Sequence, residues 1–216
     1  MSTMTFSQLP YQRPDFIELK AQYDALGAKL DAATTAEDAV TVIREWTTLR
    51  VHVSTMGSIA EVKFTQDVSS DSSKAEKQFF DENWPTFAEY EVDMAKRVLN
   101  SAHVGAISST FGELFLLRLK NSTLTFEPSI KDIMVQESEL NTKYNALTAS
   151  AKIDLDGTTY NLSTIAKPLI DPDRNVRLRA MTAMYGFLDD NAAELDEIYD
   201  KLVQLRTEKA KILGYP

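Results

Sequence analysis

The feature that most constrains the fold is an apolar stripe within residues 42–60. Its members recur at steps of four, three, four, three and four residues, the spacing of one buried face of an α-helix. They are Val42, Trp46, Leu49, Val53, Met56 and Ala60. So regular a stripe predicts a helix that packs along its whole length against an antiparallel partner.

The preceding segment is predicted to supply that partner. It carries a stripe of its own, formed by Phe16, Leu19, Tyr23, Leu26 and Leu30. Pro14 suits the first turn of this helix, where its missing N–H costs nothing. Thr35, with Asp38 three residues later, is an acidic variant of the capping box that begins the next helix. The connection between the two helices, residues 31–35, is short enough for antiparallel neighbours.

The helical pattern continues to about residue 149. Residues 67–73 are polar and are expected to form a loop. The next stripe contains Phe80, Trp84, Phe87, Met94 and Val98. Pro85 lies inside it and is predicted to kink or divide the helix, because proline removes a hydrogen bond and clashes with the preceding turn. Two more helices are expected, over 104–119 and over 128–149.

The period then changes from helical to alternating. Residues 152–155 and 158–162 alternate in polarity, and Asp156-Gly157 between them is a strong signal for a two-residue hairpin turn. Helical patterns return after Ser163, as a short helix to Ile170 and helices over 174–188 and 191–213, with Gly214 as a helix stop.

The predicted fold is therefore mostly α: an antiparallel helical bundle with one small β-hairpin near 152–162. We expect an N-terminal helical region over 1–150, and a hairpin with further helices over 151–216. In the last helix one stripe is broadened by a second set of apolar residues, which predicts burial on more than one side. The stripe is Ile198, Leu202, Leu205 and Ile212, and the second set is Tyr199, Val203 and Ala210.

Composition excludes several classes of function. Cysteine is absent, which rules out disulfides and thiolate metal sites and fits a reducing compartment. The formal net charge of −9 opposes nonspecific binding to nucleic acid or to anionic membranes. The N-terminus does not read as a secretory signal, and no apolar run is long enough to span a bilayer. The expected location is cytoplasmic, with neither nucleic acid nor membrane as a partner.

The sequence offers no catalytic, cofactor-binding or metal-binding motif. Hydrolytic zinc needs about three protein ligands, commonly His-Glu-x-x-His with a downstream carboxylate. The two histidines, His52 and His103, are not followed by glutamate. We interpret both as ordinary helix-surface or interface residues, and His103 as closing a helix C-terminus near Gly105. Gly-x-Ser-x-Gly and glycine-rich phosphate loops are also missing.

Two charged groups near residue 175 have a structural and a functional interpretation. Asp171-Pro172-Asp173 lacks the glycine and the terminal glutamate of a calcium loop, so a helix cap is favoured. The basic group Arg174, Arg177 and Arg179 is expected to pair at the surface with Asp171, Asp173 and Asp189. The alternative is that one arginine binds a peptide carboxylate through its bidentate fork.

An ordered set of segments resembles the oligoendopeptidase F family of zinc metallopeptidases. The similar segments are 11–16, 81–85, 153–160, 169–177, 195–206 and 210–215, which together span nearly the whole chain. They include Tyr11-Gln-Arg-Pro-Asp-Phe16, Ile153-Asp-Leu-Asp-Gly-Thr-Thr-Tyr160 and Ala210-Lys-Ile-Leu-Gly-Tyr215.

The resemblance implies a helical N-terminal region that forms one wall of a deep channel around a zinc site. The His-Glu-x-x-His helix of that family lies downstream of the matched region, so no family catalytic residue maps onto this sequence. The expected function is that of the N-terminal region of a zinc-dependent oligoendopeptidase, a hydrolase of short peptides. The zinc ligands would lie outside this chain, in a C-terminal catalytic region, and the chain alone should be inactive. A standalone helical protein-interaction module is the alternative.

Overall fold

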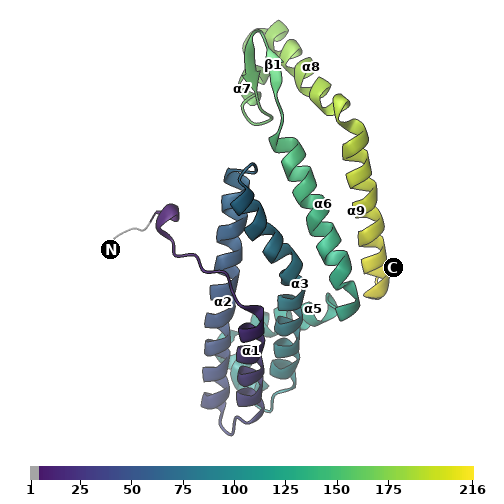
Figure 1. Cartoon of the computed structure of the whole chain (residues 1–216). Helices are drawn as coiled ribbons and strands as arrows, with labels where there is room; N and C mark the ends of the chain where they lie inside the picture. Colours follow the sequence, from purple (N-terminus) through teal and green to yellow (C-terminus); the bar gives the residue numbers. More distant parts are fainter. Residues whose placement is uncertain (1–4) are drawn as a thin grey trace. The chain divides into compact units, whose positions relative to one another are not determined.

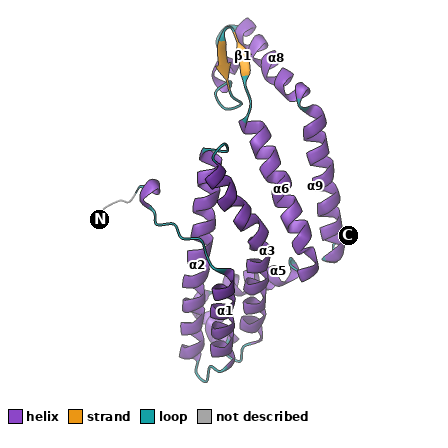
Figure 2. Ribbon diagram, in the orientation of Figure 1, coloured by secondary structure: helices purple, strands orange, loops and turns teal. Residues whose placement is uncertain are grey.

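The computed structural model describes residues 5–216, and it is predominantly helical with one small antiparallel sheet (Figures 1 and 2). By their internal contacts the residues form two compact units, one of 1–131 with 212–215 and one of 132–211. The mostly α fold with a single hairpin, predicted from periodicity, is confirmed. The domain limits at residue 150, drawn from sequence, stay a prediction.

The first unit is built on three helices that lie side by side (Figure 1). Its elements are η1 (Phe6–Gln8), α1 (Phe16–Asp31), α2 (Ala36–Gln66), α3 (Asp71–Asn100), α4 (Val104–Phe111), α5 (Glu113–Leu124) and η2 (Pro128–Ile130). The two sequence stripes on α1 and α2 face the core, where their central residues are buried with Phe87, Met94 and Val98 of α3. Trp84 departs from its stripe and is 37% exposed.

Local signals explain how α1 and α2 begin. The Asp15 side chain accepts from the backbone N–H of Ile17 and of Glu18, so Asp15 is the N-cap of α1. Pro14 precedes this cap and therefore lies next to the first turn, for which it was predicted to be suited, and not within it. Thr35 and Asp38 form the reciprocal capping box predicted for α2. Fixed starts of this kind set the register of the long helices against each other.

The prediction for residues 67–73 was wrong in its second half. The Ser70 hydroxyl accepts from the backbone N–H of Ser73, and α3 begins at Asp71. The serines that read as loop therefore serve as a cap and a first turn. Pro85 lies inside α3 without dividing it, and Figure 1 shows the helix changing direction about halfway along its length, as a proline bend requires.

The predicted helix over 104–119 is two helices. Gly112 separates α4 from α5 with a backbone φ of 89°, a conformation that glycine adopts without strain and that cannot continue a right-handed helix. The apolar pattern runs across the break because Ile107 and Leu119 both reach the same core cluster. Periodicity alone therefore concealed the turn.

The second unit combines a helical pair with a capped hairpin (Figure 2). Its elements are α6 (Lys131–Ala149), β1 (Ile153–Leu155), β2 (Thr158–Tyr160), α7 (Ala166–Leu169), α8 (Arg174–Asp190) and α9 (Ala192–Ile212). Asp156 and Gly157 both have positive φ, 50° and 80°, as a type I′ turn requires, so the hairpin prediction is confirmed. The hairpin buries Ile153 and Leu155 against Ile165 and Ala180.

Charge ties α6 to α9. Glu137 of α6 is only 9% exposed. Its carboxylate accepts from Arg206 Nε at 3.2 Å and from Lys209 Nζ, both on α9. Lys143 of α6 pairs with Glu194 at the other end of α9, at 3.3 Å. These contacts hold the two helices antiparallel. Gly214 follows α9 with a φ of 78°, the stop predicted for it.

Candidate functional site

The histidines do not form a metal centre. His52 lies on the exposed side of α2, and His103 directly precedes α4. Within residues 5–216, no three side chains of the His, Asp and Glu type are grouped so that they could hold a metal ion. The resemblance itself assigns the zinc ligands to a region outside this chain.

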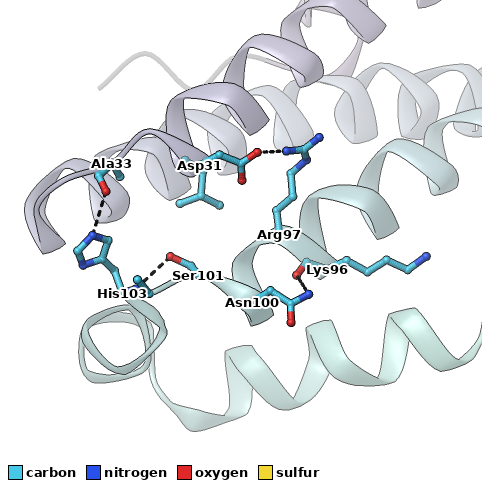
Figure 3. A pocket seen from close by; sticks show the side chains of 9 residues that line it. Asp31, Ala33, Lys96, Arg97, Asn100, Ser101 and His103 are labelled. Atoms are coloured by element: carbon cyan, nitrogen blue, oxygen red, sulfur yellow. Dashed lines mark hydrogen bonds and ion pairs between the residues drawn. The ribbon is translucent and has the colours of Figure 1, made fainter.

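His103 lies in a pocket of about 340 Å³ where the ends of α1 and α3 meet the start of α4 (Figure 3). Its ring Nε2 is 3.1 Å from the carbonyl oxygen of Ala33, which can only accept, so Nε2 donates. Its backbone N–H donates to Ser101 Oγ at 3.1 Å. His103 thus joins the α3–α4 turn to Ala33, two residues past the end of α1. The prediction that it closes a helix near Gly105 is wrong, because Gly105 lies in the first turn of α4.

The opposite side of the pocket is closed by the ion pair between Arg97 and Asp31 (Figure 3). A Cβ on Gly27 would lie 2.9 Å from Arg97 Nε, so the bare glycine is what lets this arginine cross α1 to reach Asp31. The acid of the pocket is thus paired with Arg97 and its imidazole is bonded to a carbonyl. The arrangement is that of a joint between helix ends, and it does not present an acid and a base to a substrate.

The basic group of α8 is engaged within the second unit. Arg179 makes a two-pronged contact with Asp156 of the hairpin turn, with Nη2–Oδ2 at 2.8 Å and Nε–Oδ1 at 3.3 Å. This guanidinium holds the pKa of Asp156 below its ordinary value. Arg177 donates instead to the carbonyl oxygens of Asp171 and Pro172, at 2.7 and 2.9 Å. Among the described residues, the ion pair of this basic group is that of Arg179 with Asp156, so the predicted pairing with Asp171, Asp173 and Asp189 is wrong. The partner lies on the hairpin turn, 23 residues away in the sequence, because the hairpin packs against α8.

The acidic pair before α8 has the capping role predicted for it. Asp173 Oδ1 accepts from the backbone N–H of Asn175 at 2.8 Å, and Asp173 is the N-cap of α8. Asp171 Oδ1 accepts from the backbone N–H of Asp173 at 2.8 Å. Both carboxylates therefore bond to backbone donors at the helix start.

A partly buried carboxylate that the sequence did not single out lies in the first unit. Glu91 of α3 accepts from the Tyr23 hydroxyl and from Trp46 Nε1 at 2.8 Å, and it forms an ion pair with Arg50 Nε at 2.8 Å. Burial, and then the charge of Glu91, hold the pKa of Tyr23 well above its usual range. The partners come from α1 and α2, so this cluster links the three long helices at the edge of their core. Helical spacing alone cannot reveal it, because its members are far apart in the sequence.

The second unit exposes large apolar side chains along α8 and α9, a set that we name the α8–α9 apolar face. Its members are Leu178, Met181, Tyr185, Tyr199 and Val203, which are 62, 50, 51, 68 and 45% exposed. Tyr199 and Val203 belong to the set predicted to be buried on a second side of the last helix, whereas in this chain they face solvent. The three residues of α8 were missed, although their steps of three and four carry the signal.

Comparisons with known proteins give a consistent assignment. Residues 6–126 match the model of the peptidase M3 N-terminal domain. No curated protein sequence matches the chain. An oligoendopeptidase F structure from Bacillus anthracis is 31% identical with a TM-score of 0.95, covering 100% of this chain and 40% of that one. PZ peptidase A, solved with an inhibitor, is 30% identical with a TM-score of 0.94, covering 98% of this chain and 38% of that one.

A further oligoendopeptidase F structure gives the same result, with 30% identity, a TM-score of 0.94, and coverage of 99% of this chain and 38% of that one. The chain thus spans about two fifths of the length of the solved structures that it matches. The family match covers more than half of the sequence. On this ground the chain belongs to the M3 peptidase family, and what it contains is the family's N-terminal domain.

Proposed function

We propose that the chain is the non-catalytic N-terminal region of a zinc-dependent oligoendopeptidase and forms one wall of its substrate channel. The observation that carries the proposal is the one-sided coverage of the structural matches. Each takes in 98% or more of this chain but 40% or less of the matched one. The zinc ligands and the general base would then lie in the other three fifths of such a protein.

The structure supports a role in shape rather than in chemistry. The long helices α2 and α3 are capped, packed on a shared core and cross-linked through the Glu91 cluster, so they form a stiff support. The joint at His103 fixes the helix ends. A stiff wall would restrict a channel to short, unfolded peptides, the proposed substrates of the complete enzyme.

Metal content and activity of the purified chain test this proposal. Elemental analysis after dialysis should find much less than one zinc per chain, and short fluorogenic peptides should not be hydrolysed. A tightly held zinc in one-to-one ratio, lost in a His52→Ala or His103→Ala variant, would place a metal site in this chain and overturn the proposal.

Two finer expectations stay predictions. Between residues 5 and 216 no helix combines the length and the apolar character that a membrane span needs. The cytoplasmic location was expected from the sequence and stays a prediction.

The alternative of a standalone interaction module predicts a monomer that does not bind a hydrophobic dye, whereas a region that docks onto further chain should bind the dye through its exposed apolar side chains.

A further inference from the structure

The α8–α9 apolar face is separate from the surface that these helices use for their own core. Ala180 of α8 is fully buried in the cluster with Ile153, Leu155 and Ile165. Ile198 of α9 is 2% exposed, although Tyr199 beside it is 68% exposed. Each helix therefore already buries one side. The apolar face lies on another side and is not needed to complete the second unit.

Several basic side chains of α8 and α9 are held by partners within the second unit. Arg177 and Arg179 bond to the segment before α8 and to the hairpin turn. Arg206 and Lys209 bond to Glu137 of α6. Lys201 pairs with Glu197 on its own helix, at 2.5 Å. These five cations are therefore already engaged by partners within the second unit.

The residue types of the face are those of protein interfaces. Tyrosine and methionine are enriched there, since they supply large contact areas at low cost in conformational entropy. Two tyrosines, a methionine, a leucine and a valine stand roughly half or more exposed along the two helices. Large exposed apolar patches of this kind mark surfaces that a partner covers.

The structural matches indicate what would cover this face. The solved relatives share this fold at TM-scores of 0.94–0.95, and about three fifths of each of those chains lies outside the match. We infer that the α8–α9 apolar face is where the catalytic part of the M3 peptidase packs against this N-terminal region. The inference rests on the proposed function and adds to it the surface through which the two parts join.

The absence of cysteine from the sequence permits a direct test. The whole chain is fused to the part of the Bacillus anthracis oligoendopeptidase F that lies outside the match. Single variants Leu178→Cys, Tyr199→Cys and Val203→Cys are made in the chain alone and in the fusion. Maleimide labelling of the engineered cysteine is followed by mass spectrometry of its peptide. Ile17→Cys on α1, where the native side chain is 86% exposed, is the matched control.

The expected result is labelling that slows by roughly tenfold or more at the three face positions in the fusion, because burial excludes the reagent, and an unchanged rate at position 17. Equal rates at the face positions in both proteins would refute the docking surface. Peptidase activity of the unsubstituted fusion is the separate measure of the proposed function. An active fusion with unprotected face positions rejects only the surface. A folded, zinc-loaded but inactive fusion rejects the proposed function and, with it, the inference.

Discussion

Gly57 is the position where the packing of α2 on α3 can be tested most sharply. A Cβ at this residue would lie 3.1 Å from Trp84 Cζ3 and 3.4 Å from two ring carbons of Phe80. The Trp84 ring is itself flanked by the rings of Phe80 and Phe87, with centroids 6.3 and 5.1 Å away. The indole is therefore held between two rings along α3, and we predict that Gly57→Ala destabilises the first unit.

The size of the effect follows from two opposing contributions. Replacing glycine by alanine at a compatible helical position stabilises by about 0.4–1 kcal/mol. Overpacking a well-packed contact costs about 1–3 kcal/mol. The net expectation is a loss of about 1 kcal/mol, which lowers the urea midpoint by about 0.5 M for a typical dependence of stability on urea.

Gly105→Ala is the matched control. Gly105 lies in α4 of the same unit, and a Cβ there would meet nothing within 4 Å, so only the stabilising contribution applies and the midpoint should rise. Tryptophan fluorescence is the assay, because both tryptophans, Trp46 and Trp84, belong to the first unit and report its unfolding alone. If Gly57→Ala raised the midpoint as much as Gly105→Ala, the close contact between α2 and α3 would be refuted.

Two further predictions concern the Glu91 cluster. Glu91→Gln should lower the free energy of unfolding by about 1–3 kcal/mol, since it weakens two hydrogen bonds to a carboxylate and leaves Arg50 without its acid. Urea unfolding measures this against the exposed Glu37→Gln, and equal midpoints for the two variants would contradict it. Tyr23 has a pKa raised above its ordinary value of 10.0, so its stabilisation is complete below pH 10 and is lost as the pH rises through the higher folded-state pKa. Urea unfolding at a series of alkaline pH values measures this loss of stability. Tyr23→Phe should make the free energy of unfolding fall less steeply above pH 10, whereas Tyr144→Phe, at a position 47% exposed, should leave that fall unchanged.

The elements that the sequence predicted well are those set by neighbouring residues. The stripes of α1 and α2, the Thr35–Asp38 capping box and the Asp156-Gly157 turn depend on residues within a few positions of one another, and all are found. Gly112 shows the limit of this approach. Its positive φ interrupts the helix, although the apolar stripe continues on both sides. The stripe continues because α4 and α5 each bury an apolar side in the same core cluster.

What the sequence could not supply are contacts between distant residues. Arg179 pairs with Asp156, 23 positions away, rather than with the acids closest to it in the sequence. Glu91 receives its donors from positions 45 and 68 residues away. The α8–α9 apolar face reads in the sequence as another buried stripe. Spacing shows which residues share a side of a helix, but not whether the covering atoms belong to the same chain segment.

The tie between α6 and α9 makes mutational tolerance uneven along the chain. Glu137 serves two cations, so loss of Arg206 or of Lys209 still leaves one of them to bond to the carboxylate. Loss of Glu137 removes both bonds at once and leaves two like charges side by side on α9 without the acid that served them. Sequence drift should therefore be accepted at either basic position much more readily than at the single acid.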